Sequence, residues 1–404
     1  MQARWTYEVA NRGNEERNDA NAPLHWDGRA VLWPISRFQC DRDTRVRDPQ
    51  RRGSVLELHR VTPNGNATRM ELFPSTTIIA QSWSFLPIGQ LLLLHVGDFH
   101  SVTDCRRLDN APGVNASHGA GRGIFLQRDE RLYFVGGGQL YCYDVGRDTC
   151  SWTLDLSSSR SYQAGPLALQ QDRLICYGRD ALNFIDPASG TVEKQLTLPR
   201  IDKLYPPREY EGDLLIAYTN WTTGGLVRLD AETNEIKWRF KSKGRVAVPR
   251  GGDLPVVGDI AVVSINDGSS LVGVDLRTGD ARWTYRSQWL YTPIAVDGGS
   301  LIFGTSGGYG RHLRRHRADS GETEWAVQFD GGCPYFSRQG EYLVAGDWGG
   351  VLRRVHEVDG CVVDELHLGA PICTAPLIIG AGIFVLKWPT DGSAPALVAV
   401  ATDS

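Results

Sequence analysis

Three tryptophans of this 404-residue chain occupy matching places in the sequence. They occur as Thr-Asn-Trp at Trp221, Gly-Asp-Trp at Trp348 and Leu-Lys-Trp at Trp388, each directly after an apolar run. Large aromatic side chains gathered at one kind of turn are typical of protein-binding surfaces. The alternative interpretation is that each ring covers the end of its own hairpin.

Other aromatic, basic and imidazole side chains occur in segments that we expect on the same side of the molecule. These binding candidates are Trp289, Tyr205, Arg208, Arg250, Tyr291, Tyr309, Arg311, His312 and Tyr335. Phenol, imidazole and guanidinium groups can also move protons or hold anions. Tyr205, Arg208, Arg250, Tyr291, Tyr335 and His312 therefore form a second, catalytic hypothesis, in which the sequence assigns no roles.

Sequences that suggest other chemistry are weaker. Gly304 to Gly308 reads GTSGG, but a nucleophile elbow needs a helix after its turn and none is expected here. His95 and Asp98 face opposite sides of an extended strand, so they do not converge on a metal with His100. We expect no metal site.

A repeat of about forty residues must position all these side chains. Its clearest copies are LDAETNEIKWRF, VDLRTGDARWTYR and HRADSGETEWAVQF, whose tryptophans are Trp238, Trp283 and Trp325. Trp152, Lys194 and Asp364 occupy the same place in weaker copies, so successive steps are 42, 44, 45, 42 and 39 residues. The regular spacing predicts an array of identical units.

Each unit contains alternating apolar runs separated by turn residues at about ten-residue spacing, without helical periodicity. Four short strands per unit predict the blade of a β-propeller. RWTYEV near the beginning places Trp5 in the motif position, while the last unit lacks a fourth strand. We therefore expect the N-terminal strand to complete the last blade and close the ring.

The Asp-x-x-x-Gly-x-x-x-Trp pattern resembles the pyrroloquinoline-quinone-like (PQQ-like) propeller repeat, and the resemblance extends from about Gly121 to the end. It implies an all-β closed propeller, for which we prefer eight four-stranded blades and leave nine open. Quinone-dependent enzymes of this kind typically carry adjacent cysteines, which this chain lacks, so we expect no cofactor. The family's outer-membrane assembly lipoprotein is disfavoured because no lipid-attachment cysteine is present near the N-terminus.

The repeats predict a single domain over residues 1–404. A charged insertion at about residues 38–53 interrupts the first hairpin, and a degenerate blade is expected at about residues 82–120. The net charge of −4 argues against nucleic acid as a partner. The basic run RHLRRHR from Arg311 is interpreted as a solvated outer face.

The N-terminal sequence has no apolar segment of the signal-peptide type, and no apolar run is long enough to cross a membrane. We therefore expect a cytoplasmic monomer. The preferred hypothesis is a rigid platform that binds a protein or peptide partner through its aromatic and arginine-rich face. The alternative is a tailoring enzyme in a biosynthetic pathway, acting on a small molecule or peptide in the axial funnel.

Overall fold

All regular elements that the structure describes are β-strands. The computed structural model describes residues 1–8, 16–19, 24–39, 54–76, 82–88, 91–97, 102–107, 125–136, 139–147, 149–156, 167–170, 172–178, 181–197, 203–220, 222–230, 232–233, 235–249, 254–266, 268–286, 290, 292–306, 311–332, 334–372, 374–388 and 395–401. Among them, none forms a helix that is long and apolar enough to span a membrane.

The described strands belong to nine separate sheets, which we number in chain order. Sheet 1 contains β2 (Glu16–Asp19), β3 (His25–Trp26), β4 (Val31–Gln39), β5 (Ser54–Val61) and β6 (Ala67–Thr76). Sheet 2 contains β7 (Ser82–Ile88), β8 (Leu91–Gly97) and β9 (Val102–Arg107), and sheet 3 contains β10 (Phe125–Arg128), β11 (Arg131–Gly136), β12 (Gln139–Asp144) and β13 (Thr149–Asp155).

The next three sheets lie in the middle of the chain. Sheet 4 contains β14 (Leu167–Gln170), β15 (Arg173–Gly178), β16 (Ala181–Ile185) and β17 (Val192–Thr197). Sheet 5 contains β18 (Lys203–Leu204), β19 (Arg208–Tyr210), β20 (Asp213–Thr219), β21 (Gly224–Leu229) and β22 (Ile236–Ser242). Sheet 6 contains β23 (Val246–Ala247), β24 (Val256–Val257), β25 (Ile260–Ile265), β26 (Ser270–Asp275) and β27 (Ala281–Tyr285).

The last three sheets include the first strand of the chain. Sheet 7 contains β28 (Ala295–Asp297), β29 (Ser300–Thr305), β30 (Arg311–Arg317) and β31 (Thr323–Phe329). Sheet 8 contains β32 (Tyr335–Gln339), β33 (Tyr342–Gly346), β34 (Val351–His356) and β35 (Val362–His367). Sheet 9 contains β36 (Leu377–Ile379), β37 (Gly382–Lys387) and β38 (Ala396–Ala401), followed by β1 (Gln2–Glu8) as its fourth strand.

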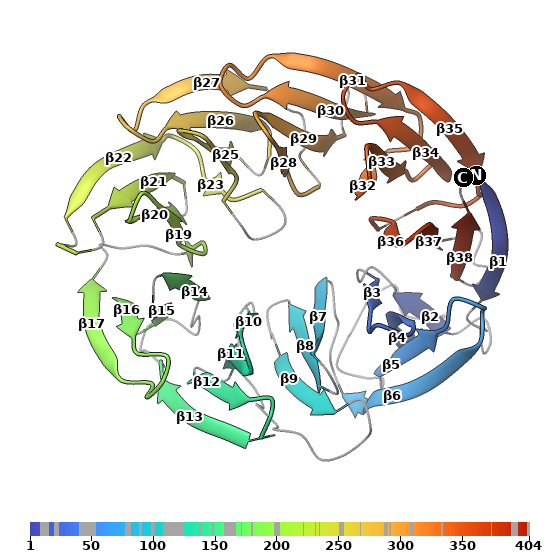
Figure 1. Ribbon diagram of the computed structural model, residues 1–404, viewed down its shortest axis with the longest axis horizontal. Helices are drawn as coiled ribbons and strands as arrows, with labels where there is room; N and C mark the ends of the chain where they lie inside the picture. The colour runs from blue at the N-terminus through green and yellow to red at the C-terminus, as the bar shows by residue number, and fades with distance from the viewer. Residues whose placement is uncertain are drawn as a thin grey trace.

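The sheets follow one another around a central axis, as Figure 1 shows. Within each described sheet the strand pairs are antiparallel. The described residues form nine sheets. The sequence analysis preferred eight blades and left nine open. The difference arises at sheet 2, whose three described strands end at residue 107, before residues 108–124, which lie outside the described part.

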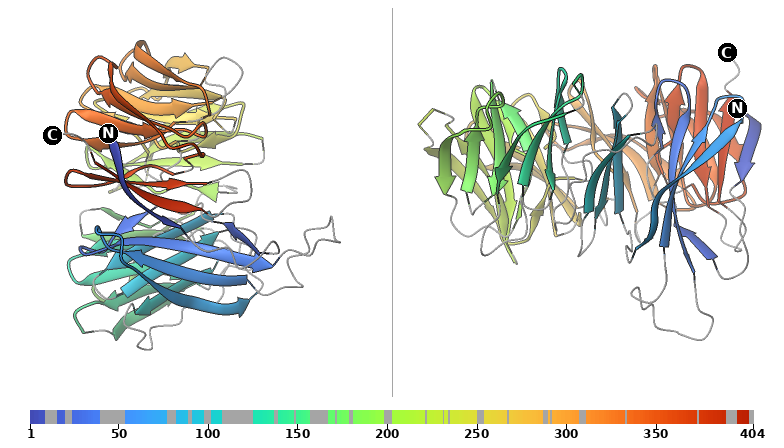
Figure 2. Two further views of the ribbon diagram at one scale, coloured as in Figure 1. Left: turned by 90° about the vertical axis from the view of Figure 1, so that its right-hand side faces the viewer. Right: turned by 90° about the horizontal axis from the view of Figure 1, so that it is seen from below.

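The first strand completes the last sheet, as the sequence predicted. β1 pairs with β38 over the register Gln2↔Ala401 to Glu8↔Ala396. The side views in Figure 2 show the blue first strand next to the red strands of the last sheet. The charged insertion expected at about residues 38–53 lies almost entirely outside the described residues, which stop at residue 39 and resume at residue 54.

Burial follows the position of each strand in its sheet. All seven residues of β20 are buried, because a middle strand has a neighbouring sheet on both of its faces. The outer strand β22 alternates between exposed and half-buried residues, so only one face is covered. An alternating apolar strand and a continuously apolar strand are therefore both expected within one unit.

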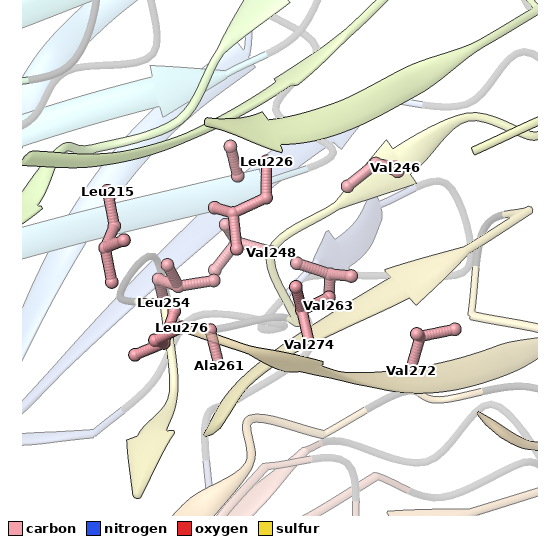
Figure 3. Packing of buried hydrophobic residues seen from close by; sticks show 11 residues of the cluster. Leu215, Leu226, Val246, Val248, Leu254, Ala261, Val263, Val272, Val274 and Leu276 are labelled. Carbon is pink, nitrogen blue, oxygen red and sulfur yellow. The ribbon is translucent and has the colours of Figure 1, made fainter. Parts of the chain in front are cut away.

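The apolar core is divided among the junctions between sheets. Leu215 and Leu226 of sheet 5 pack against Val263, Val272 and Val274 of sheet 6, which is the cluster shown in Figure 3. Similar clusters join sheets 3 and 4, 4 and 5, 6 and 7, 7 and 8, 8 and 9, and 9 and 1. Neighbouring sheets are thus held together by buried side chains rather than by shared strands.

The motif tryptophans reinforce these junctions with hydrogen bonds. In each case the indole Nε1 donates to a backbone carbonyl in the third-to-fourth-strand turn of the next sheet. The pairs are Trp152 to Pro187 (3.1 Å), Trp238 to Leu276 (2.8 Å), Trp283 to Ala318 (2.8 Å), Trp325 to Glu357 (3.0 Å) and Trp5 to Pro63 (2.8 Å). We call this contact the tryptophan clasp. The clasp of Trp5 joins sheet 9 to sheet 1.

The motif glycine is required by the same clasp. Gly279 has φ of +81°, and a Cβ atom placed there would lie 2.8 Å from the Trp238 ring. Gly321 has φ of +72°, and its Cβ would lie 2.7 Å from the Trp283 ring. Both the left-handed backbone and the close approach of the indole exclude a side chain at these positions.

Three clasps contain a second donor that the repeat motif does not reveal. Arg228 Nη1 donates to the Leu276 carbonyl (3.0 Å) that also accepts from Trp238. Arg315 Nη1 donates to Glu357 (3.0 Å) beside Trp325, and Arg131 Nη1 donates to Pro187 (3.1 Å) beside Trp152. The Leu276 and Glu357 carbonyl oxygens thus each accept two hydrogen bonds from the preceding sheet, which use both lone pairs, and the Pro187 carbonyl accepts a third from Tyr133 Oη (3.3 Å).

Replacement of Trp238 by phenylalanine should isolate the hydrogen bond of one clasp. Most ring contacts are kept, but the Leu276 carbonyl loses its indole donor, so we expect unfolding to become about 1 kcal/mol more favourable. Guanidinium chloride denaturation measures the change. Trp348→Phe is the matched control, because Trp348 is half-exposed and should leave stability unchanged. Equal effects of the two variants would contradict the role of the clasp.

His316 of β30 is a neutral imidazole buried at the junction of sheets 6 and 7. It is 1% exposed, and its ring centroid lies 4.5 Å from that of Tyr285 and 4.8 Å from that of Phe303. Its Nδ1 lies 3.1 Å from the Gly321 carbonyl oxygen and its Nε2 lies 3.2 Å from Thr323 Oγ1. Burial lowers the pKa of His316 from 6.5 to about 4.

The lowered pKa of His316 predicts acid-sensitive folding. The unfolded chain binds the proton near pH 6.5 and the folded protein only near pH 4, so stability present above pH 6.5 falls as the pH is lowered through this window. The loss should be about 3 kcal/mol at pH 4. His316→Phe should remove this part of the pH dependence, and the exposed His367→Gln should not. Denaturation between pH 4 and pH 7 tests both expectations.

Candidate functional site

The antiparallel order of the strands gives the molecule two different faces. The turn face carries the turns from first to second and from third to fourth strand. The loop face carries the connections from second to third strand and the linkers between sheets. Trp348 and Trp388, the described tryptophans that were predicted on second-to-third connections, belong to the loop face.

Only part of the predicted set lies in the described residues. Trp221, Trp289, Arg250, Tyr291 and Tyr309 lie outside them. The structure describes Trp348, Trp388, Tyr205, Arg208, Arg311, His312 and Tyr335. The site can therefore be described around this second group.

Trp348 presents its indole to solvent on the loop between β33 and β34. Its exposed fraction is 50%, which makes it the most exposed tryptophan of the described residues. The neighbouring Asp347 is 0% exposed, and its carboxylate accepts hydrogen bonds from Gly331 N (2.8 Å) and Val351 N (3.0 Å). The carbonyl of Asp347 also accepts from Ile372 N (2.8 Å). The loop is thus fixed to both linkers that flank sheet 8.

Backbone packing fixes the position of Trp348 further. A Cβ atom on Gly331 would lie 1.7 Å from Gly349 N, so the linker and the loop touch through their main chains. Gly332 has φ of +148°, and its Cβ would lie 3.2 Å from the Trp348 side chain. The exposed indole therefore stands on a rigid support made of glycine backbone.

Arg311 of sheet 7 contacts the same linker. Its Nη1 donates to the carbonyl of Asp330, and its side chain is exposed. Arg311 and Trp348 thus contact the linker of residues 330–332 from sheets 7 and 8. An exposed indole next to an exposed guanidinium is a combination that protein-binding sites favour.

Tyr205, Arg208 and Trp388 lie at other junctions between sheets. Tyr205 packs against the cluster between sheets 5 and 6, and Arg208 Nη1 donates to the Leu254 carbonyl (2.7 Å) across the same junction. Trp388 packs against the cluster between sheets 9 and 1. His312 and Tyr335 are half-buried in β30 and β32. Tyr205 and Arg208 are therefore used at a junction away from Trp348.

The basic run of β30 differs from the solvated outer face that the sequence predicted. β30 is the third strand of sheet 7, not its outer strand, and its central residues are half-buried. Arg315 forms ion pairs with Asp297 (3.1 Å) and Glu324 (2.8 Å). The Arg314 guanidinium lies 5.9 Å from the centroid of the Tyr285 ring. Most of this positive charge is used for packing between strands and sheets.

Three basic residues that sequence reasoning missed lie on the loop face without ion pairs. Lys243, Arg245 and Arg286 are exposed, and none of them forms an ion pair within the described part of the chain. Each lies within three residues after the end of an outer strand, three to seven residues beyond the motif tryptophan. A charge pattern at these repeat positions is the signal that could have revealed them.

The turn face is acidic in contrast. The repeated turn geometry places Asp186, Asp230 and Asp275 where their carboxylates accept backbone N–H groups of the same turn. The N–H of Thr233 and the ammonium group of Lys237 lower the pKa of Asp230 to about 2. In the described residues no group of three or more His, Cys, Asp or Glu side chains could hold a metal ion.

Comparisons with known proteins agree with this architecture. Residues 182–313, about a third of the chain, match the family model described as outer membrane protein assembly factor BamB. This match confirms PQQ-like repeats in that stretch, although the model bears the name of the lipoprotein that the N-terminal sequence disfavoured. No curated protein matches the sequence.

Two solved structures are similar to this chain at low sequence identity. BamB from Moraxella catarrhalis is 17% identical, over 81% of this chain and 96% of its own, with a TM-score of 0.48. The computationally designed protein Ika8 is 11% identical, over 77% of this chain and 94% of its own, with a TM-score of 0.50. The described chain is an all-β propeller that contains PQQ-like repeats.

The support of Trp348 can be tested with two glycine variants. Gly331→Ala forces a Cβ against Gly349 N, so we expect a loss of about 2 kcal/mol or more in stability and altered Trp348 fluorescence. Gly299→Ala is the control, because nothing lies within 4 Å of a Cβ at that position, and it should change stability by less than about 1 kcal/mol. Thermal denaturation measures the stability of both variants, and an equal change in the two would refute the close contact at Gly331.

Proposed function

We propose that this protein is a rigid platform that binds a protein or peptide partner through the part of the loop face around Trp348. The observation that carries the proposal is a half-exposed indole on a loop whose neighbouring aspartate is fully buried. Few side-chain or backbone rotations need to be lost when such a residue binds, so little ordering entropy opposes the complex. Propeller repeats in residues 182–313 support a scaffold in general.

We also propose that the nine sheets form one closed ring. The clasp of Trp5 on Pro63 and the cluster between sheets 9 and 1 support closure at the chain ends. Closure would protect the edges of the sheets and hold the loop face in one shape. The cytoplasmic location and the monomeric state remain part of the proposal, to be tested by fractionation and by light scattering.

The platform is favoured over an enzyme by the engagement of the predicted catalytic residues. Tyr205 and Arg208, two of the six residues proposed for chemistry, are used at the junction of sheets 5 and 6. Trp348 has no such role in a core cluster of the described residues, and its exposure needs a different explanation.

A capture experiment tests the platform directly. Wild-type protein and Trp348→Ala are immobilised, and the proteins retained from a lysate of the source cells are identified by mass spectrometry. Truncation of a central tryptophan should cost about 2 kcal/mol or more of binding free energy, so the partner should be lost on the order of 30-fold. The control is Val363→Ala, which removes an equally exposed apolar side chain from the outer strand β35.

Loss of a partner with Trp348→Ala but not with Val363→Ala would support the platform. Equal retention by both variants and the wild type would contradict the role of Trp348. Specific retention of a small molecule in place of a protein would favour the enzyme hypothesis instead.

A further inference from the structure

The unpaired basic residues and Trp348 lie along one arc of the loop face. Lys243 and Arg245 belong to the linker after sheet 5, and Arg286 to the linker after sheet 6. Arg311 and Trp348 follow in sheets 7 and 8, which are the next sheets around the axis in Figure 1. We call Lys243, Arg245, Arg286 and Arg311 the basic arc.

Several other arginines of these sheets are neutralised by carboxylates. Arg228 pairs with Asp213 (2.5 Å) and Glu211 (3.1 Å), and Arg353 pairs with Glu365 (2.6 Å). In the basic arc, Arg311 donates only to a backbone carbonyl, and the other three form no ion pair with any described residue. Asp330 is the exposed acidic residue next to Arg311 in this arc.

The opposite face has the reverse charge. In the same sheets its turns carry exposed acidic residues, among them Glu232, Glu235, Asp280, Asp319, Glu322 and Asp359. Among the described residues of sheets 5 to 8, exposed positive charge thus lies along the basic arc, and exposed negative charge lies on the turns of the opposite face. Such a field attracts a negatively charged partner to the loop face and repels it from the other.

We propose that the basic arc and Trp348 together bind an acidic peptide segment that carries an aromatic or aliphatic side chain. The carboxylates of the segment would pair with the four cations, and its apolar side chain would cover the indole of Trp348. This inference rests on the proposed platform function and specifies the chemistry of the partner. Charge complementarity steers the encounter, and the indole supplies the buried contact.

An acidic peptide fits these residues better than a nucleic acid does. A nucleic acid needs a continuous row of cations for its regularly spaced phosphates. Asp330 is an exposed residue of the linker that Arg311 contacts, and its negative charge would repel a phosphate backbone there. A flexible peptide can place its carboxylates away from Asp330 and its apolar residue on Trp348.

Defined probes test this proposal by fluorescence anisotropy. The probes are fluorescein-labelled peptides of mixed Glu and Phe, of Glu and Ser, and of Lys and Phe, together with a single-stranded DNA oligonucleotide. We expect the Glu/Phe peptide to bind most tightly and to weaken as salt is added. The triple variant Lys243→Glu/Arg245→Glu/Arg286→Glu should weaken binding on the order of 10-fold or more.

A second triple variant controls for net charge. Arg147→Glu/Arg277→Glu/Arg317→Glu changes the net charge by the same amount on the turn face, where the three side chains are exposed and in surface ion pairs of small energy. It should bind the Glu/Phe peptide as the wild type does. Trp348→Ala should reduce binding of the Glu/Phe peptide to the level of the Glu/Ser peptide.

Several outcomes would overturn the proposal. If the Lys/Phe peptide bound as tightly as the Glu/Phe peptide, the charge of the peptide would not determine binding. If the oligonucleotide bound more tightly than the Glu/Phe peptide, the basic arc would be assigned to nucleic acid. Failure of the wild type to bind the Glu/Phe peptide, with a partner still lost from Trp348→Ala in the capture experiment, would reject the acidic specificity and leave the platform intact. Concentration-dependent assembly that only the basic-arc variant abolishes would assign the arc to the turn face of a second copy.

Discussion

The hydrogen bond from a tryptophan indole to a turn carbonyl of the next sheet is the contact on which this architecture depends. A single sheet of four short strands cannot bury both of its faces, so each must be held against its neighbours. At five junctions of the described residues the clasp does this at the outer strand, while the apolar clusters do it further in. Because Gly279 and its equivalents must accept the ring, the two halves of each clasp are encoded in successive repeats.

The repeat made this part of the fold predictable. Spacing of the motif residues indicated four-stranded units, and the resemblance of RWTYEV to RWTYR indicated that β1 completes the last sheet. The number of sheets was less certain because sheet 2 carries no motif residue, so its unit could be counted or left out. The second donors Arg228, Arg315 and Arg131 could not be predicted, since the shared carbonyl is visible only after the sheets are packed.

The candidate site was less predictable than the fold. The sequence placed Trp348 and Trp388 in equivalent turns, yet one indole is half-exposed and the other packs against a core cluster. The difference comes from tertiary contacts. The loop of Trp348 packs on the backbone of Gly331 and Gly332, whereas Trp388 packs against the apolar cluster between sheets 9 and 1. Whether Lys243, Arg245 and Arg286 form ion pairs depends on which carboxylates lie near them in the folded protein. The pattern of apolar and polar residues in the sequence does not predict this.

The pairing of β1 with β38 has a consequence for how the chain folds. Ribosomes deliver the N-terminal strand first, but its partner becomes available only after all the other described strands have been made. Until then sheet 9 has three strands, and the indole of Trp5 cannot be brought from that sheet onto the turn of sheet 1. Each completed sheet can pack on the one before it during synthesis, so the last step is the joining of two distant ends of the sequence. That step has the largest loop-closure entropy in the molecule, and it should set the time at which the protein becomes resistant to proteases.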